Sequence, residues 1–325
     1  MTREQSMHAA LNQSIVGGML LDTRFHLFSR RRPSGVIDNP RTVFAISTTL
    51  IEASPELDKL LTGGFSESVL SDIFEENTEI EGQEVTDAQY GYESDSDLED
   101  DDVEIELGTA DSGNQPAGMS AAPDAVLKKA DHDVGEAIDL AMESGNKSSR
   151  PPTRNRPRCP GRTVFVKDIA YKTWQALLSY LYTGRVAFAP LRSAVQSSND
   201  RTNTVNLRHP FDPPLCSPKS MYRLADKYGL EELKKLAYDN ICSQLTADNV
   251  LPEVFSKFTS RFSEFRELEV KLLSEEFLHK DVIANTLPDW IANLADGDLP
   301  HAKSIWTSII FSLIDKVPYY SPLHG

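Results

Sequence analysis

The chain has 325 residues, of which 40% are hydrophobic, and it carries a formal net charge of −16 at pH 7. This length is enough for one or two folded domains, each with its own buried core. The acidic balance excludes a general nucleic-acid-binding protein, since such a protein needs a basic face to neutralise phosphates.

The predicted elements begin after an N-terminal segment, residues 1–18. Residues 22–28 alternate apolar and polar side chains, a period of two that predicts a half-buried strand, and residues 42–47 predict a second strand. The apolar spacing then becomes helical. Ser54 is a good helix N-cap and Pro55 suits the first turn of a helix, so the pattern predicts two short helices that meet at this pair.

The acidity of the chain belongs to one segment. Residues 71–107 contain sixteen Asp and Glu and no Lys or Arg, and the acids outside this segment equal the 33 Lys and Arg in number. Residues 71–160 as a whole are poor in apolar side chains, so they cannot offset a chain entropy of about 1–2 kcal/mol per residue. We predict a disordered acidic insertion over this range. It ends in a basic, proline-rich stretch, residues 150–162, which is either a solvated linker or a patch for nuclear import or nucleic acid.

Folded patterns resume over residues 161–245, apart from a polar loop at 189–216. A strand is predicted first, followed by a helix whose apolar face contains Trp174 and which should end at Gly184. After the polar loop, Ser217 is a predicted N-cap, and further helices follow it.

Residues 246–325 continue the helical spacing and are predicted to form a C-terminal helical extension. In the last helix, this spacing places Trp306, Ile309, Ile310 and Leu313 on one side. The sequence shows no internal repeat.

The cysteines and the hydropathy pattern bear on the compartment. Cys159, Cys216 and Cys242 are odd in number and share no short spacing, which predicts a reducing environment and neither a disulfide framework nor a zinc site. No apolar stretch reaches the roughly 18 residues that a membrane-spanning helix needs, and no basic leader of a secretory signal is present. We therefore expect an intracellular protein, in the cytoplasm, the nucleus or both, with no membrane partner.

The sequence contains no recognisable catalytic or cofactor-binding pattern. Its seven His residues are scattered without ligand spacing. A metalloprotease helix, a phosphate loop, a nucleotide fingerprint and a nucleophile elbow are all absent. We therefore expect no catalytic residue, no cofactor and no metal, and an enzyme of an unrecognised type is the least favoured alternative.

Three stretches, in this order, resemble the BTB/POZ domain: FAISTTLIEASPELDKLLTGGFSES, VFVKDIAYKTWQALLSYLYTG and MYRLADKYGLEELKKLAYDNICSQLTADNV. The phrases LLSYLYTG and LADKYGLEELK are the most specific, and the two polar insertions make the chain look like fungal members of this family. The resemblance covers residues 19–70 and 161–245. It implies an α+β fold, a helical cluster flanked by a short β-sheet, that the acidic insertion splits in two. BTB/POZ domains are protein–protein interaction modules, and many of them form homodimers.

The resemblance also implies candidate partner-binding residues. Many family members bridge a cullin scaffold to a protein substrate for ubiquitin transfer, and an apolar-x-Glu motif in their loop after the second helix pair binds the cullin. Phe65 and Glu67 stand at this position. Phe65 is either an exposed anchor for a cullin, with Glu67 as a directional charge beside it, or a side chain packed onto its own domain. Tyr182, in the helix end that lies near the cullin surface in the family, is a further candidate. The competing interpretation is a self-associating scaffold or transcription-linked regulator that uses no cullin.

Ser94 and Ser96 are candidate phosphorylation sites within the acidic run. Each has an acid three residues further on, Asp97 and Glu99, a context that acid-directed kinases favour. Each phosphate would add about −1.5 to −2 charges. Because the segment is expected to be extended already, we expect a change in its electrostatics toward partners and not in the fold. The alternative is an acidic tract that only keeps the protein soluble.

Overall fold

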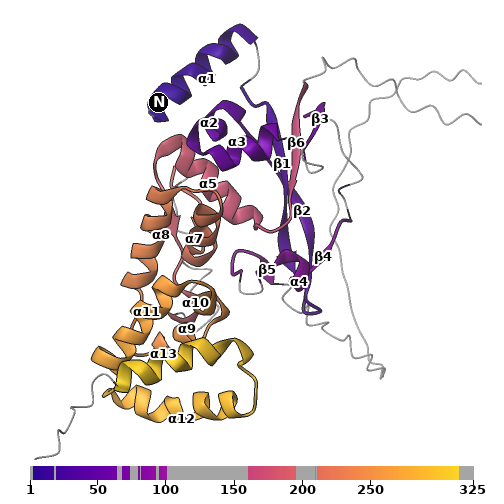
Figure 1. Ribbon diagram of the computed structural model, residues 1–325. Coiled ribbons are helices and arrows are strands. Elements are labelled where there is room, and N and C mark those ends of the chain that lie inside the picture. Colours follow the sequence, from indigo (N-terminus) through magenta and orange to yellow (C-terminus); the bar gives the residue numbers. More distant parts are fainter. Residues whose placement is uncertain are drawn as a thin grey trace, which may run out of the picture. The chain divides into compact units, whose positions relative to one another are not determined.

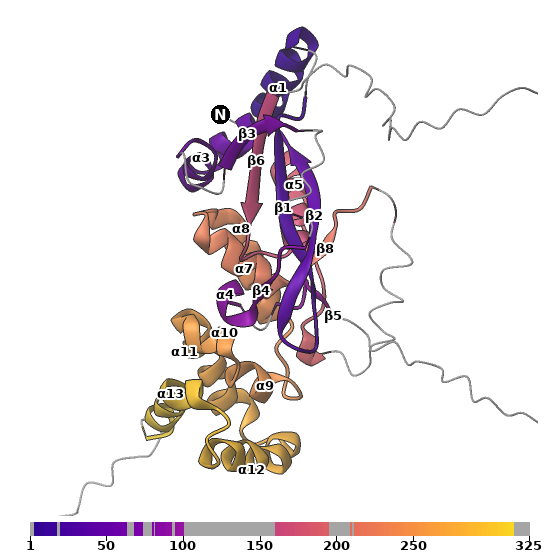
Figure 2. The same cartoon turned by 90° about the vertical axis from the view of Figure 1, so that its right-hand side faces the viewer.

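The structure is a computed structural model, and the chain divides into two units, residues 1–102 with 158–325 and residues 103–157. It describes residues 3–17, 20–63, 68–73, 80, 82–92, 95–100, 160–194, 209 and 211–314, all of which belong to the first unit. This unit is mixed α+β, with helices and a small sheet (Figure 1), and the second view looks onto the strands (Figure 2). The expected α+β class is therefore confirmed.

A six-stranded sheet forms the framework of this unit. Its strands are β1 (Thr23–Arg31), β2 (Val36–Ala45), β3 (Ser68–Asp72), β4 (Val85–Thr86), β5 (Glu99–Asp100) and β6 (Pro160–Val166). The strand order is β3-β6-β1-β2-β4, and β5 pairs with β1 beyond the end of β6. The hairpin of β1 and β2 is antiparallel, whereas β6 joins β1 in parallel from a distant part of the sequence. The two halves of the domain thus share one sheet.

The central strand β1 is more deeply buried than its alternating pattern predicts. Its polar side chains Arg24 and His26 are buried as well as its apolar ones. Both have partners on neighbouring strands: Arg24 Nε donates to Thr163 Oγ1 at 3.2 Å, and His26 Nδ1 lies 3.1 Å from Thr42 Oγ1. The prediction of a half-buried strand was wrong because these hydrogen bonds replace the water that polar side chains require.

The first part also contains helices, of which α5 lies against β1 and β2 and α4 lies against β2 and β4. They are α1 (Arg3–Gly17), α2 (Ser47–Ala53), α3 (Pro55–Thr62), α4 (Asp87–Tyr90), α5 (Tyr171–Thr183), α7 (Pro218–Lys227) and α8 (Glu231–Ser243). A short parallel pair, β7 (Ala187–Phe188) and β8 (Leu215–Cys216), and a helical turn, η1 (Arg192–Ala194), stand between α5 and α7. The predicted polar loop 189–216 therefore begins and ends in ordered structure.

The helix boundaries follow the capping signals of the sequence. Ser54 accepts hydrogen bonds from two N–H groups of the next turn, which separates α2 from α3 as predicted. Ser217 caps α7 by accepting from the N–H of Ser220. Gly184 follows the last residue of α5 with a φ of 72°, a left-handed conformation that costs glycine little.

The first hydrophobic core lies between the sheet and these helices. Trp174 is fully buried, and its ring centroid lies 4.8 Å from that of Phe25 on β1 and 5.7 Å from that of Tyr228 after α7. The predicted core position of Trp174 is confirmed. Truncating a buried aromatic of this kind costs about 3–5 kcal/mol, so these three rings hold the helices to the sheet.

The helices after residue 245 form a second core, and all of them are short or medium in length. They are α9 (Val250–Val254), α10 (Lys257–Arg261), α11 (Ser263–Leu272), η2 (Leu273–Phe277), α12 (Asp281–Ala295), η3 (Pro300–Ala302) and α13 (Lys303–Ile314). Phe255 occupies the centre, with its ring centroid 5.3 Å from that of Trp290 and 5.1 Å from that of Trp306. The helical extension thus has a core of its own.

The predicted apolar side of α13 is partly wrong. Ile309 is buried as expected, but Ile310 is 53% exposed, and Ile305 is fully buried in its place. The reason is that α13 packs against α11, so only the apolar side chains on that side of α13 are buried.

One tyrosine of the first core holds phenylalanines from the C-terminal helices in that same core. Tyr222 on α7 makes edge-to-face contacts with Phe258, Phe262 and Phe265, at centroid distances of 5.9, 5.1 and 4.8 Å. Aromatic pairs in this geometry contribute about 0.5–1.5 kcal/mol beyond their buried area. The C-terminal helices are therefore fixed to α7.

The disordered insertion predicted from residue 71 does not begin there. β3 extends to Asp72, and residues 82–92 and 95–100 contain β4, α4 and β5. Tyr90, Tyr92 and Leu98 are buried in the first core. The prediction failed because the mean composition of a long acidic stretch conceals a few apolar anchors within it. Residues 101–159, including the basic stretch up to that point, lie outside the described residues.

A close chain approach marks the place where the second half enters the sheet. Gly161 in β6 lies so near Asp22 and Ile73 that a Cβ at this position would overlap the carbonyl oxygen of Asp22 and the side chain of Ile73. The next residue, Arg162, donates its N–H to that carbonyl at 2.9 Å. A glycine is required here for steric reasons.

Among the described residues, no helix combines the length and the apolar character needed to cross a bilayer.

We predict that a Gly/Ser linker of about 20 residues can replace residues 103–157 without loss of cooperative unfolding. β5 pairs with β1 at Arg31 and β6 pairs with it at Thr23, so the linker spans roughly 27 Å along an extended strand. A Gly/Ser chain of this length has a root-mean-square extension of roughly 25 Å. Urea titration followed by tryptophan fluorescence measures the outcome.

The matched control extends the same deletion back to residue 82. Because Tyr90, Tyr92 and Leu98 then leave the core, the free energy of unfolding should fall by about 3 kcal/mol or more. Unchanged stability in this longer deletion, or loss of cooperativity in the shorter one, would contradict a boundary at residue 100.

Candidate functional site

The structure describes only some of the residues that the sequence singles out. Phe65, Glu67 and Ser94 lie outside the described residues. Tyr182 is half-buried at the end of α5, and its hydroxyl accepts the N–H of Ile46 at 3.0 Å. Burial raises the pKa of Tyr182 to about 12. The hydroxyl is therefore engaged within the domain, and the proposed cullin contacts stay predictions.

Two buried aspartates, Asp95 and Asp97, form the most constrained polar cluster, which we name the aspartate anchor. Asp97 Oδ1 accepts the backbone N–H of Ser217 at 2.7 Å, and its Oδ2 accepts the hydroxyl of Thr173 at 2.6 Å. Ser217 caps α7 and Thr173 lies in the first turn of α5. The carboxylate therefore sits at two helix N-termini, where the helix dipoles favour an anion.

Asp95 is surrounded by hydrogen-bond donors. Its Oδ1 accepts the hydroxyl of Ser220 at 2.8 Å and the N–H of Asp97 at 3.0 Å, and its Oδ2 accepts the hydroxyl of Tyr90 at 2.7 Å. Each carboxylate oxygen thus has at least one donor, which a buried acid requires. The hydrogen bond between the side chains of Asp95 and Ser220 therefore holds the acidic segment to α7.

Arg223 on α7 covers the anchor. Its guanidinium carbon lies 4.3 Å from the ring centroid of Tyr92, a cation–π geometry, and its Nη2 lies 3.8 Å from Asp95 Oδ2. The same guanidinium donates to the carbonyl oxygen of Asp168. Arg223 therefore supplies the positive charge that opposes the buried acids.

The two acids affect each other. Burial, and then the neighbouring Asp95 carboxylate, raise the pKa of Asp97 to about 7, while the hydrogen bonds from Thr173 and Ser217 oppose this rise. Asp97 therefore holds its proton more tightly than an ordinary carboxyl group does. Ser96 lies between these acids and is only partly exposed. A phosphate there would add negative charge beside them, so the expectation that phosphorylation of Ser96 leaves the fold unchanged does not fit this location.

A second pair of buried acids, Glu253 and Glu269, lies where the C-terminal helices meet the first domain; we name it the glutamate pair. Glu253 forms an ion pair with Lys219 of α7 and accepts the hydroxyl of Ser193 in η1. Both glutamates are almost completely buried. These contacts link α9 to two separate segments of the first part.

The hydrogen bonds of Thr259 indicate the protonation state of Glu269. Thr259 Oγ1 lies 2.9 Å from the carbonyl oxygen of Glu253 and 2.9 Å from Glu269 Oε2. A hydroxyl has one hydrogen and a carbonyl only accepts, so both contacts are satisfied when Glu269 carries a proton and donates it to Thr259. Burial, followed by the charge of Glu253, raises the pKa of Glu269 to about 8, in agreement with a neutral acid at pH 7.

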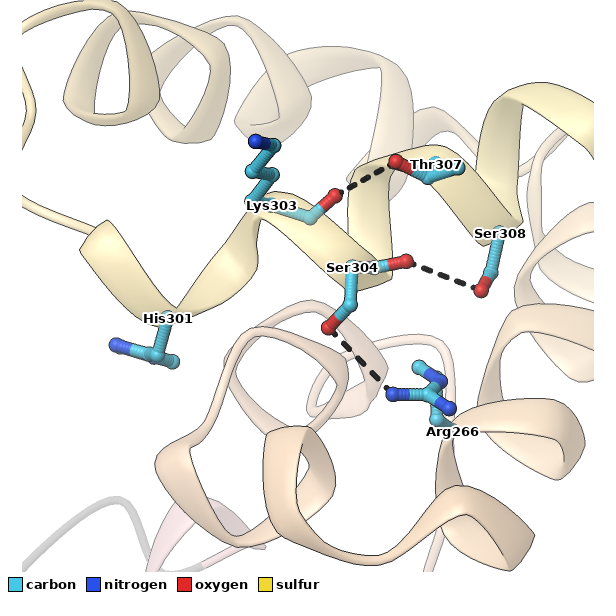
Figure 3. A pocket seen from close by; sticks show the side chains of 6 residues that line it. All are labelled: Arg266, His301, Lys303, Ser304, Thr307 and Ser308. Carbon is cyan, nitrogen blue, oxygen red and sulfur yellow. Dashed lines mark hydrogen bonds between the residues drawn. The ribbon is translucent and has the colours of Figure 1, made fainter.

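A surface cavity with basic lining lies in the C-terminal helices (Figure 3). It has a volume of about 460 Å³ and is lined by Arg266, His301, Lys303, Ser304, Thr307 and Ser308. We name it the basic cavity. Arg266 comes from α11, and the other five residues come from η3 and α13. Every lining side chain is a cation, a histidine or a hydroxyl, and none is a carboxylate.

No cluster of three or more His, Cys, Asp or Glu with metal-binding geometry occurs within the described ranges. Comparison with protein-family models, curated proteins and solved structures gave no match to this chain.

Sequence reasoning missed all three clusters, and two of them left a signal. Glu269 stands one helical turn after the apolar Phe265, a charged residue on an apolar helix face. Tyr90, Tyr92 and Leu98 are apolar anchors among acids. The basic cavity left none, because its residues come from helices that are far apart in the sequence.

We predict that Asp97→Asn alters the pH dependence of stability. Asp97 has a pKa of about 7 in the folded protein and an ordinary value of 3.8, so the folded state holds the proton more tightly between these limits. This contribution is present at low pH and is lost as the pH rises toward 7. Relative to Asp97→Asn, the wild type should lose up to about 1.4 kcal/mol of unfolding free energy per pH unit in this window. Urea titrations between pH 5 and pH 8 measure the unfolding free energy of the wild type minus that of Asp97→Asn. If this quantity stays constant or rises with pH, the result would count against the raised pKa.

We predict opposite outcomes for the two glutamates at pH 7. Glu269→Gln should leave the unfolding free energy within about 1 kcal/mol, because the amide can donate to Thr259 as the protonated acid does. Glu253→Gln should cost about 1–3 kcal/mol, because it leaves the largely buried ammonium of Lys219 without its counter-charge. Equal losses in the two variants, measured by urea titration, would show that Glu269 is ionised.

Proposed function

We propose that this chain is a protein–protein interaction module of the BTB/POZ type that associates with a second copy of itself. The observation that carries the proposal is an apolar face left in water on α1. Leu11, Ile15 and Val16 are 42%, 79% and 92% exposed, although Ala10 of the same helix is buried. Leu11 and Ile15 are one turn apart, so these side chains lie on adjoining parts of the helix surface.

Exposed apolar side chains are common singly, but a contiguous group on one helix is typical of an interaction site. Burying such a surface contributes about 25 cal/mol per Å² of apolar area. A second copy would cover the same face on both partners, as a twofold interface requires. The α1 face is therefore suited to self-association.

An exposed edge of the described sheet is a second feature that a partner could bind. β3 is the end strand of the described sheet, and Leu70 on it is 75% exposed. β3 pairs with the first residues of β6, which pair with the start of β1, shortly after α1 in the chain. The edge strand of a sheet can offer backbone hydrogen bonds to a partner, in addition to an apolar contact.

The order of elements also supports the BTB/POZ assignment. Two strands precede the helix pair α2 and α3, strands β3 to β6 with the short helix α4 follow, and α5 and the helix pair α7 and α8 end the first part. A helical cluster beside a short sheet is what the resemblance implies. The finer expectation of a cullin adaptor depends on Phe65 and Glu67 and stays a prediction.

We predict that the wild-type chain elutes with twice its mass of 36.2 kDa in size-exclusion chromatography with light scattering. Ile15→Glu combined with Val16→Glu places two charges in the apolar face, so the dissociation constant should rise by roughly tenfold or more. Both side chains are exposed, so circular dichroism should show an unchanged fold.

The matched control is Leu236→Glu on α8, which changes a side chain that is 43% exposed but far from α1 in the sequence. It should leave the oligomeric state unchanged. A wild-type chain that is monomeric at about 50 µM, or a double variant that stays dimeric, would refute self-association through α1.

A further inference from the structure

The basic cavity stands out against the charge of the whole chain. The protein has 49 acidic and 33 basic residues, yet no acid lines this cavity. Neither Arg266 nor Lys303 forms an ion pair with a carboxylate within the described part of the chain. Uncompensated positive charge in a concave site attracts anions.

The hydroxyl groups differ in what they can offer a ligand. Thr307 and Ser308 donate their hydrogens to the carbonyl oxygens of Lys303 and Ser304, at 2.9 and 3.0 Å, within the helix. Their hydroxyls are therefore occupied. Figure 3 shows Ser304 facing Arg266, whose Nη1 donates to Ser304 Oγ at the long distance of 3.4 Å. The hydrogen of Ser304 Oγ has no acceptor within the described residues, so it is free to donate.

The cationic side chains provide further donors. Toward the described residues, the guanidinium of Arg266 makes only the long contact with Ser304, which leaves most of its five N–H groups for an anion. The ammonium of Lys303 points away from Arg266 in Figure 3, but its stem is exposed and flexible, so it can turn toward a bound charge.

His301 has one nitrogen in use and one without a partner. Its Nε2 lies 2.8 Å from the carbonyl oxygen of Phe255, so Nε2 must carry the hydrogen. Its Nδ1 is a buried atom with no hydrogen-bond partner. With the hydrogen on Nε2, Nδ1 is a hydrogen-bond acceptor, so His301 lines the cavity without donating to an anion.

We propose that the basic cavity binds the phosphoryl group of a small phosphate ester. Arg266 and Ser304 hold the phosphoryl oxygens, and Lys303 completes the site from the start of α13. A phosphoryl group has several acceptor oxygens and close to two charges, which matches a lining that has two cations and no carboxylate. The volume of about 460 Å³ is within the range of small-molecule sites and leaves room for an organic part. This site is independent of self-association through α1.

The test is titration calorimetry of the full-length chain with ribose 5-phosphate and with inorganic phosphate, at constant ionic strength set by sodium chloride. Ribose 5-phosphate should bind saturably. Inorganic phosphate should bind more weakly, because it fills only the phosphoryl position. Equal affinity for the two probes would identify the free anion as the ligand and overturn the ester assignment.

Two variants locate the binding. Arg266→Gln and Lys303→Gln should each weaken ribose 5-phosphate by roughly tenfold or more, the usual effect of losing a charge-assisted contact. Lys303 is exposed, so its variant keeps the test valid even if Arg266→Gln lowers stability. The control Lys271→Gln removes an exposed charge from α11 outside the cavity lining and should bind normally. Binding that is absent, or equally strong in all variants, would overturn the site.

Discussion

The structure depends on how two carboxylates from an acidic segment become buried without remaining unsatisfied. Asp95 and Asp97 exchange water for hydrogen bonds from Tyr90, Thr173, Ser217 and Ser220, and Arg223 opposes their charge. Removing water from an ion is costly unless such partners replace it. Because the partners lie on α5 and α7, the anchor holds the end of the first half of the domain against the second half. β5 can then pair with the same edge of β1 as β6, beyond the end of β6.

The aspartate anchor and the glutamate pair lie at different places in the fold but share one arrangement of groups. In each, one acid has a raised pKa because a second acid and burial act on it, at Asp97 in the aspartate anchor and at Glu269 in the glutamate pair. In each, a threonine hydroxyl forms a hydrogen bond with the acid whose pKa is raised, Thr173 with Asp97 and Thr259 with Glu269. Buried polar clusters of this kind contribute little net stability but restrict how segments can dock. Here they fix the acidic segment and the C-terminal helices relative to α7, to which both attach.

The apolar face of α1 and the basic cavity are two separate regions of the surface. The apolar α1 face is suited to another protein surface, and the basic cavity, at the other end of the chain, is suited to a small anion. The two sites share no element, so each can be altered without the other.

The local signals of the sequence determined much of the fold. Ser54 with Pro55, Ser217 with Pro218, and Gly184 fixed helix boundaries, because capping depends on the residue itself and its next turn. The burial of Trp174 followed from helical periodicity. Tertiary structure alone decided which acids are buried, because Thr173, Ser217 and Ser220, which donate to Asp95 and Asp97, lie more than seventy residues further along the chain. The same reason applies to the basic cavity, where α11 brings Arg266 to the start of α13. Composition averages over a segment, whereas burial depends on the few positions that meet a partner in space.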